Sequence, residues 1–282
     1  MCLAFAACSN DNDLVINNEA MTPVTVQVEG FAVSQEDMPV TRATAVGSYT
    51  NVKALTLAFY KSDGTESYKH TQLRDDASNY TTFGEFSCTL PMGNYTMVVI
   101  GYCGTSPFTL TSATAATCTD TRLQDNFVAI QVVNINSSNA VNLTATLDRV
   151  VSRLGVVSTD NRAADAAKIR MTFSGGGRDF NPTTGFATTN TGFANTLTFV
   201  EAVGATTSSA SYLFLGSDEQ MMNVTIETLD ADDNVLFTKT VTDVPFKRNR
   251  TTILTGNVFT AGSNVSSITI NSDWLDSHNV DF

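Results

Sequence analysis

Residues 90–100 read LPMGNYTMVVI, a turn that leads into an apolar, β-branched run. Pro91 and Gly93 are typical of a tight reversal, and the run from Tyr95 to Ile100 favours a strand. The residues before the turn, Phe-Ser-Cys-Thr-Leu at 86–90, alternate apolar and polar, as expected for a strand with one buried face. Two such runs around a short turn predict an antiparallel hairpin.

The same pattern recurs along the rest of the chain. Turn signals such as Asp63-Gly64 separate short runs, and no amphipathic segment of helical period lies between them. The expected strands are 22–32, 51–60, 85–90, 94–102, 127–133 and 140–147, then 168–173, 196–203, 211–215, 222–229, 235–241, 251–259 and 266–271. This repetition predicts an all-β protein and excludes a helical bundle and a helix-covered parallel sheet.

Length and strand number together predict two β-sandwiches in tandem. A chain of 282 residues is about twice the commonest domain size, and each half holds six or seven expected strands. Residues 147–154 read as a helical or irregular segment before a polar stretch, so the junction is expected there. The expected parts are a leader remnant with an acidic tether at 1–20, an N-terminal sandwich at 21–157 and a C-terminal sandwich at 158–282.

Composition excludes several functions. The formal charge is −12, from 28 acidic and 16 basic residues, and would repel a nucleic-acid backbone. Only His70 and His278 are available for imidazole chemistry or for histidine metal sites. The glycine-rich stretch 174–178 lacks the Gly-Lys-Ser/Thr of a phosphate loop and is expected to be an ordinary loop. We therefore expect that the protein is not an enzyme and that it has no cofactor and no metal site.

The first residues, MCLAFAACS, end in small residues before a cysteine, as at a bacterial lipoprotein cleavage site. Cys8 is the candidate lipidation site, and the acidic, polar stretch 9–13 after it is typical of a tether. The alternative is a frayed apolar tail with a free thiol. Cys88, Cys103 and Cys118 then remain; one disulfide and three buried thiols are both possible, and the alternating run around Cys88 favours thiols.

One basic cluster, Lys247-Arg248-Asn249-Arg250, stands out in this acidic chain. It is a candidate grip for an acidic partner, but the flanking residues 245–246 and 251–254 favour a connection between two strands.

Several stretches together resemble the fimbrillin superfamily, the subunits of type V pili of Bacteroides-type bacteria. The resemblance spans nearly the whole chain. It is carried by the Cys8 region with its acidic tail, PVTRA at 39–43, LPMGNY at 90–95, LDR at 147–149 with RL at 153–154, and VPFKRNRTT at 244–252 with GN at 256–257.

This resemblance implies two tandem transthyretin-like antiparallel β-sandwich domains. It further implies export as an outer-membrane lipoprotein, removal of an N-terminal segment by an arginine-specific protease, and polymerisation with other fimbrial subunits by donor-strand exchange. The corresponding positions are Cys8 for lipidation, Arg42 and Ala43 for cleavage, Val24, Val26 and Val28 for the removable strand, and Ile268, Ile270 and Trp274 for the donor strand. Alternation of the three valines with polar residues agrees independently with a detachable strand.

Alternatives remain at three of these positions. An available Arg42 favours a stalk subunit over an anchor, although it is also compatible with a solvated loop arginine. The terminal strand with Ile268 and Ile270 is equally suited to completing its own sandwich. A glycan-binding surface lipoprotein is the alternative function, but Trp274 is the single tryptophan available for a sugar platform.

Overall fold

The computed structural model describes residues 20–32, 43–260 and 267–271, and the regular secondary structure there is almost entirely β-strand. The one helical element there is a single 3₁₀ turn, η1 (Ala77–Asn79). No helix in these ranges is long and apolar enough to cross a membrane. The all-β prediction is confirmed.

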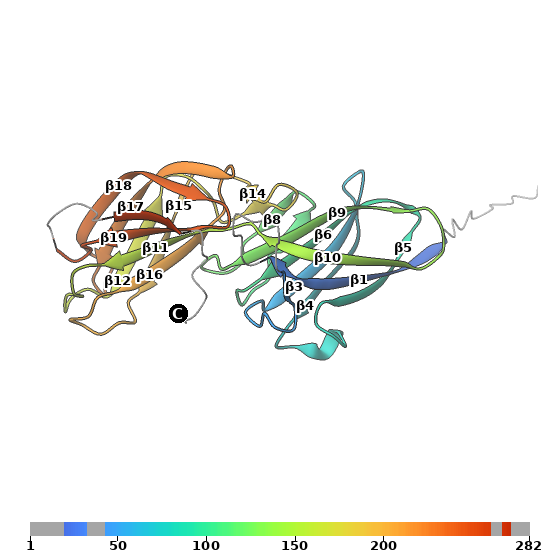
Figure 1. The fold of residues 1–282 in the computed structure, drawn as a ribbon, viewed down its shortest axis with the longest axis horizontal. Helices are drawn as coiled ribbons and strands as arrows, with labels where there is room; N and C mark the ends of the chain where they lie inside the picture. Colours follow the sequence, from blue (N-terminus) through green and yellow to red (C-terminus); the bar gives the residue numbers. More distant parts are fainter. Residues whose placement is uncertain (1–19, 33–42, 261–266, 272–282) are drawn as a thin grey trace, which may run out of the picture.

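Two lobes lie side by side along the long axis of the molecule, with β8 and β14 between them (Figure 1). The N-terminal lobe consists of β1 (Met21–Ala32), β2 (Ala43–Ala45), β3 (Ala54–Lys61), β4 (Glu66–Leu73), β5 (Glu85–Pro91), β6 (Gly93–Tyr102), β9 (Asn126–Ile135) and β10 (Val141–Arg149). The C-terminal lobe consists of β11 (Ser152–Ser158), β12 (Lys168–Phe173), β15 (Phe193–Thr198), β16 (Ser208–Leu213), β17 (Glu219–Leu229), β18 (Val235–Lys247), β19 (Thr251–Gly256) and β20 (Ser267–Asn271).

The N-terminal lobe is sandwich-like, although its strands form one continuous sheet in the order β2-β1-β10-β9-β6-β3-β4, with β5 also paired to β1. β10 meets β9 at only two register positions, Asp148↔Val128 and Arg149↔Phe127, so the sheet folds over at this point. Inward residues of β1, β5 and β10 thereby pack against those of β3, β6 and β9 in one buried cluster.

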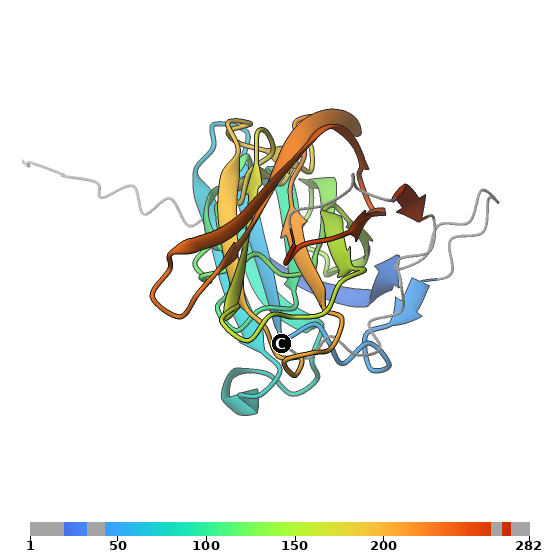
Figure 2. The ribbon, with the colours of Figure 1, turned by 90° about the vertical axis from the view of Figure 1, so that its left-hand side faces the viewer.

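The C-terminal lobe has two separate four-stranded sheets, β16-β11-β19-β20 and β15-β12-β17-β18, which enclose a second apolar cluster. Leu154 and Val156 of β11 face Ile169 and Met171 of β12 in this core. Figure 2 views this lobe end-on, with the dark red β20 at the outer edge of its sheet.

A small fourth sheet joins the lobes. Its strands are β7 (Thr109–Ser112), β8 (Ala115–Thr117), β13 (Phe180–Asn181) and β14 (Phe186–Ala187), in the order β14-β13-β8-β7. Two of them come from each half of the chain. We call this sheet, with the residues packed around it, the joint.

Three expectations differ from the structure. Residues 147–154 are the end of β10 and the start of β11 rather than a helical or irregular segment, because the arginines that interrupt the apolar pattern are used in the joint. β11, placed in the N-terminal domain by the expected boundary at 157, pairs with β16 and β19 of the C-terminal lobe. The strand expected at 196–203 is β15, which ends at Thr198, where its partner β12 begins; Val200 and Val203 are exposed.

Candidate functional site

β1 occupies an inner position in the N-terminal lobe. It runs parallel to β10, with Val24 opposite Val141, and antiparallel to β5, with Val24 opposite Cys88. Val24, Val26 and Val28 are only 1 %, 1 % and 4 % exposed and point into the core. Without β1, the lobe would have an apolar groove flanked by two unpaired strand edges.

Of the predicted lipidation and cleavage positions, only Ala43 lies within the described residues. Cys8 and Arg42 are outside the described residues. Ala43, the residue after Arg42, begins β2, and it lies opposite Ala32 at the end of β1. A cut between residues 42 and 43 would therefore separate β1 from the remaining chain while leaving β2 at the new end.

The burial of the Cys88 thiol depends on the neighbouring strand β1. Cys88, Cys103 and Cys118 are free and half-buried, so the expectation of unpaired thiols is confirmed. Cys88 lies on the core side of β5 beside β1, and burial raises the pKa of its thiol from 9.0 to about 11.

The terminal strand β20 pairs antiparallel with β19, with Ile268 opposite Leu254 and Ile270 opposite Thr252. Ile268 is 43 % exposed there, whereas Leu254 is 1 % exposed. In the single chain the strand thus extends the edge of its own sheet, and Ile268 contributes little to the core. Trp274, the third expected donor residue, is outside the described residues.

Asp160 fixes the chain just before this terminal strand. Its carboxylate accepts hydrogen bonds from the backbone N–H groups of Val258, Phe259 and Thr260 at 2.9–3.0 Å and from the Thr260 hydroxyl at 2.9 Å. Burial opposes the charge, but these hydrogen bonds outweigh it and lower the pKa of Asp160. The C-terminal lobe is therefore fastened as far as Thr260 by contacts that do not involve β20.

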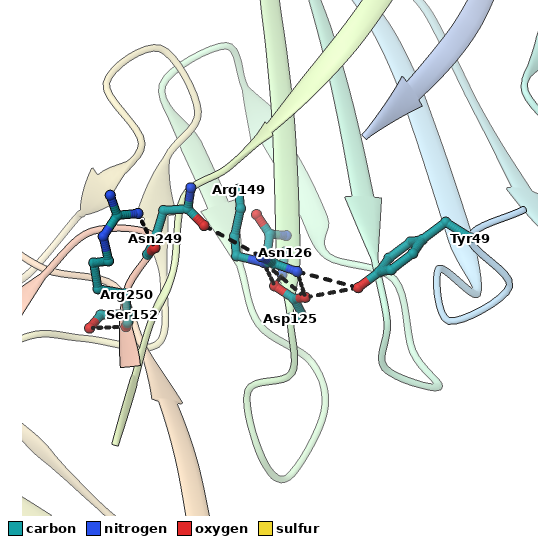
Figure 3. Close-up of polar contacts among 7 residues, drawn as sticks. All are labelled: Tyr49, Asp125, Asn126, Arg149, Ser152, Asn249 and Arg250. Carbon is teal, nitrogen blue, oxygen red and sulfur yellow. Dashed lines mark hydrogen bonds and ion pairs between the residues drawn. The ribbon is translucent and has the colours of Figure 1, made fainter. Parts of the chain in front are cut away.

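A buried ion pair lies at the joint (Figure 3). Arg149, at the end of β10, donates from Nε and Nη2 to both carboxylate oxygens of Asp125 at 2.9–3.0 Å. The two side chains are 2 % and 7 % exposed. Burial would lower the pKa of Arg149, but the charge and hydrogen bonds of Asp125 outweigh it and raise the pKa. Tyr49 donates to Asp125 at 3.3 Å, and burial, together with the charge of Asp125, raises the pKa of its hydroxyl.

The same network reaches the C-terminal lobe. Arg149 donates from Nη1 to Oδ1 of Asn249 in a long hydrogen bond of 3.4 Å, and Ser152 donates to the carbonyl of Arg250 at 3.2 Å (Figure 3). Asn249 has φ 56°, a left-handed conformation that asparagine tolerates better than most residues. The basic cluster 247–250 thus connects β18 to β19, and it meets the 147–154 stretch in space.

Aromatic rings complete the joint. Phe108 and Phe180 have ring centroids 5.2 Å apart, and Phe180 stacks on Phe214 at 4.3 Å. All three are buried, and they come from both halves of the chain. Sequence reasoning found the two polar stretches of the joint but missed these rings and Tyr49 and Asp125, which carry no local motif.

A cleft of about 720 Å³ opens between the lobes beside the joint, where β9 and β10 diverge. On its C-terminal side Lys247 pairs with Glu219 at 2.7 Å and Arg248 with Asp218 at 2.6 Å. None of its lining residues is aromatic. Every described Trp, Tyr or Phe side chain is buried or half-buried, so the described surface provides no exposed aromatic platform for a sugar.

A family model matches residues 17–281, and its description is a family of unknown function, DUF6562. The chain is a member of the DUF6562 family. No curated protein matches the sequence of this DUF6562 member.

Solved structures share the fold of this DUF6562 member at low identity. A candidate adhesin from Bacteroides ovatus is 12% identical with a TM-score of 0.51, over 85% of this chain and 88% of that one. A candidate polysaccharide-binding protein from Bacteroides thetaiotaomicron is 12% identical with a TM-score of 0.51, over 89% and 96%. The fimbrial anchor protein Mfa2 from Porphyromonas gingivalis is 13% identical with a TM-score of 0.50, over 89% and 98%. The expected resemblance to Bacteroides-type fimbrillins is confirmed at the level of the fold.

Proposed function

We propose that this protein is a structural, non-enzymatic subunit of a cell-surface fimbria that supports adhesion, built from two transthyretin-like lobes and assembled by donor-strand exchange. The position of β1 carries the proposal. Its three valines are buried in the core between β5 and β10, yet β1 precedes every other described strand, so a single cut after it releases it. Each valine that leaves the core costs about 1.5–3 kcal/mol, which an incoming apolar strand would restore.

The terminal strand is the proposed donor. β20 forms backbone hydrogen bonds only to β19 among the described strands, and Ile268 stays 43 % exposed. Moving it into the groove of a neighbouring subunit would exchange one set of strand pairs for another and would bury more of Ile268 than its own sheet does. Strand addition of this kind supplies affinity through backbone bonds and specificity through side-chain pockets.

Processing and export belong to the same proposal. Acylation of Cys8 would hold the precursor at the outer membrane, and an arginine-specific protease would cut between Arg42 and Ala43. All other arginines lie within the described residues, and each of them is buried or half-buried. Protection of these sites by the fold favours Arg42 as the first site of cleavage.

The test treats the purified chain with an arginine-specific protease, identifies the new N-terminus and follows the product by electron microscopy. We expect a first cut that exposes Ala43-Thr44-Ala45-Val46, followed by rods. Arg42→Lys is the matched control, since it keeps the charge and removes the protease site; it should give neither product. Rods from the uncut Arg42→Lys variant, or cut protein that releases β1 and stays monomeric, would contradict the mechanism.

A further inference from the structure

A small, partly enclosed cavity of about 50 Å³ lies beside β16, where the N-terminal lobe meets the C-terminal lobe. One water needs on the order of 10–15 Å³, so this cavity has room for several waters or for one small oxyanion. The polar residues that line it are Arg122 and Gln124 from the N-terminal half, and Arg153, Asn195, Ser211 and Tyr212 from the C-terminal half.

Arg153 and Tyr212 are neighbours in this cavity. They lie opposite each other in the β11–β16 pair, so their side chains project from the same face of the sheet. Burial raises the pKa of Tyr212, the charge of Asp125 acts in the same direction, and the positive charge of Arg153 opposes them. Arg153 thus places a guanidinium close to a tyrosine hydroxyl that stays protonated at neutral pH.

Neither arginine has a carboxylate partner within the described residues. Arg122 and Arg153 are half-buried, and neither guanidinium forms an ion pair or a side-chain hydrogen bond there. Asp125, the acidic group that also acts on Tyr212, already has both oxygens bound by Arg149. Both arginines line one partly enclosed cavity, so an anion there would be attracted by two positive charges. In a chain with 28 acidic and 16 basic residues, such a pair stands out.

We propose that this cavity is a binding site for a small oxyanion, a carboxylate or sulfate group, held between Arg122 and Arg153. The guanidinium presents its N–H donors in a planar fork that matches the oxygens of such a group. Asn195 and Tyr212 add polar side chains to the lining. Carboxylate and sulfate groups occur as free ions and on acidic sugars, and both sources present the same chemistry to this site.

The experiment titrates the full chain with sodium sulfate at constant ionic strength, exchanging sulfate for chloride, and follows the arginine Nε–Hε signals by NMR. We expect saturable shifts in two arginine signals, lost one at a time in Arg122→Gln and Arg153→Gln. Removing one charge-assisted hydrogen bond should weaken binding about tenfold or more in each variant. Arg153→Lys keeps the charge but loses the planar fork of donors, so its affinity for sulfate should lie between those of the unmodified chain and Arg153→Gln. Lys61→Gln, a matched loss of charge at an exposed position on β3, should bind as the unmodified chain does.

A second arm distinguishes the sources. A disaccharide ending in glucuronic acid is compared with its neutral glucose counterpart. Saturation by the acidic sugar alone supports a glycan source, and saturation by sulfate without the sugar supports a free anion. Linear, unsaturated shifts with both probes, or equal binding by Arg153→Gln and Lys61→Gln, would overturn the site. Circular dichroism of each variant verifies folding. The outcome is independent of the proposed polymerisation, which does not use this cavity.

Discussion

The first strand of each lobe pairs in the same way, with one parallel and one antiparallel neighbour. The two strands differ in how they connect to the rest of the chain. β1 runs parallel to β10 and antiparallel to β5, and β11 runs parallel to β19 and antiparallel to β16. β11 follows β10 through Val150 and Val151, both buried in the joint. β1 precedes every other described strand. The two first strands therefore share their pairing, and the joint holds β11 but not β1; our proposal assigns the releasable role to β1 for this reason.

The edges of the lobes differ in the same sense. β19 has β20 on its outer side, whereas residues 141–147 of β10 have no partner on the side away from β1 among the described strands. In the proposed assembly, the N-terminal lobe would release its buried strand β1, and the C-terminal lobe would donate its edge strand β20. Head-to-tail assembly needs this asymmetry, because a strand leaving one lobe must enter another.

The largest effect is expected from breaking the joint, which fixes β11. Asp125→Asn leaves the buried Arg149 without its counter-charge and should lower the free energy of unfolding by about 3–5 kcal/mol. Chemical denaturation at neutral pH measures it. Asp148→Asn is the matched control, because Asp148 is an acidic residue next to Arg149 in the sequence but is exposed. It should change the free energy of unfolding by less than about 0.5 kcal/mol. Equal effects of the two variants would show that the ion pair does not hold the joint.

Release of β1 should be measurable at Cys88. Its pKa of about 11 keeps the thiol protonated at pH 8, and loss of β1 should return the pKa toward 9.0. Two pKa units correspond to about 100-fold more thiolate, so alkylation at pH 8 should accelerate by up to about 100-fold. Above about pH 11 both forms are ionised, and that part of the difference should vanish.

Mass spectrometry of the labelled peptides measures this rate after cleavage at Arg42. Cys103, a half-buried thiol whose pKa is also raised by burial, provides the internal control and should keep its slow rate. A synthetic β20 peptide should restore protection of Cys88 in the cut protein. Unchanged labelling of Cys88 after β1 has been removed would show that β1 does not protect this thiol.

Matched truncations sharpen the comparison of the two first strands. Val26 of β1 and Val156 of β11 are 1 % and 2 % exposed. Val26→Ala and Val156→Ala should each lower the free energy of unfolding of the intact chain by about 2 kcal/mol, through lost burial and the resulting cavity. After cleavage and replacement of β1 by a donor peptide, only Val156→Ala should still be destabilising. A persistent effect of Val26→Ala in that complex would mean that β1 stays in place.

The sequence predicted those strands that have one buried face and alternate clearly, such as β1, β5 and β17. It missed β4, an edge strand with mostly polar residues, and the joint strands of two to four residues, which are too short for a period to show. It also misjudged residues 147–154, because Arg149 is explained only by Asp125, a partner 24 positions away. The releasable strand was visible as a local pattern, whereas the joint depends on contacts between distant residues.

The smallest effect is expected at β20, where Ile268 and Leu254 lie opposite each other but differ in exposure, at 43 % and 1 %. Leu254→Ala should cost about 2–5 kcal/mol as a core truncation. Ile268→Ala should lower the stability of the single chain by about 1 kcal/mol or less, because Ile268 is already 43 % exposed. The same variant should nevertheless reduce rod formation after cleavage at Arg42, because in a neighbour's groove this side chain would be buried. Rod formation therefore distinguishes donation of β20 to a neighbouring subunit from completion of its own sheet. If Ile268→Ala lowers stability as much as Leu254→Ala and leaves rod formation unchanged, β20 belongs to its own lobe and another segment must fill the groove.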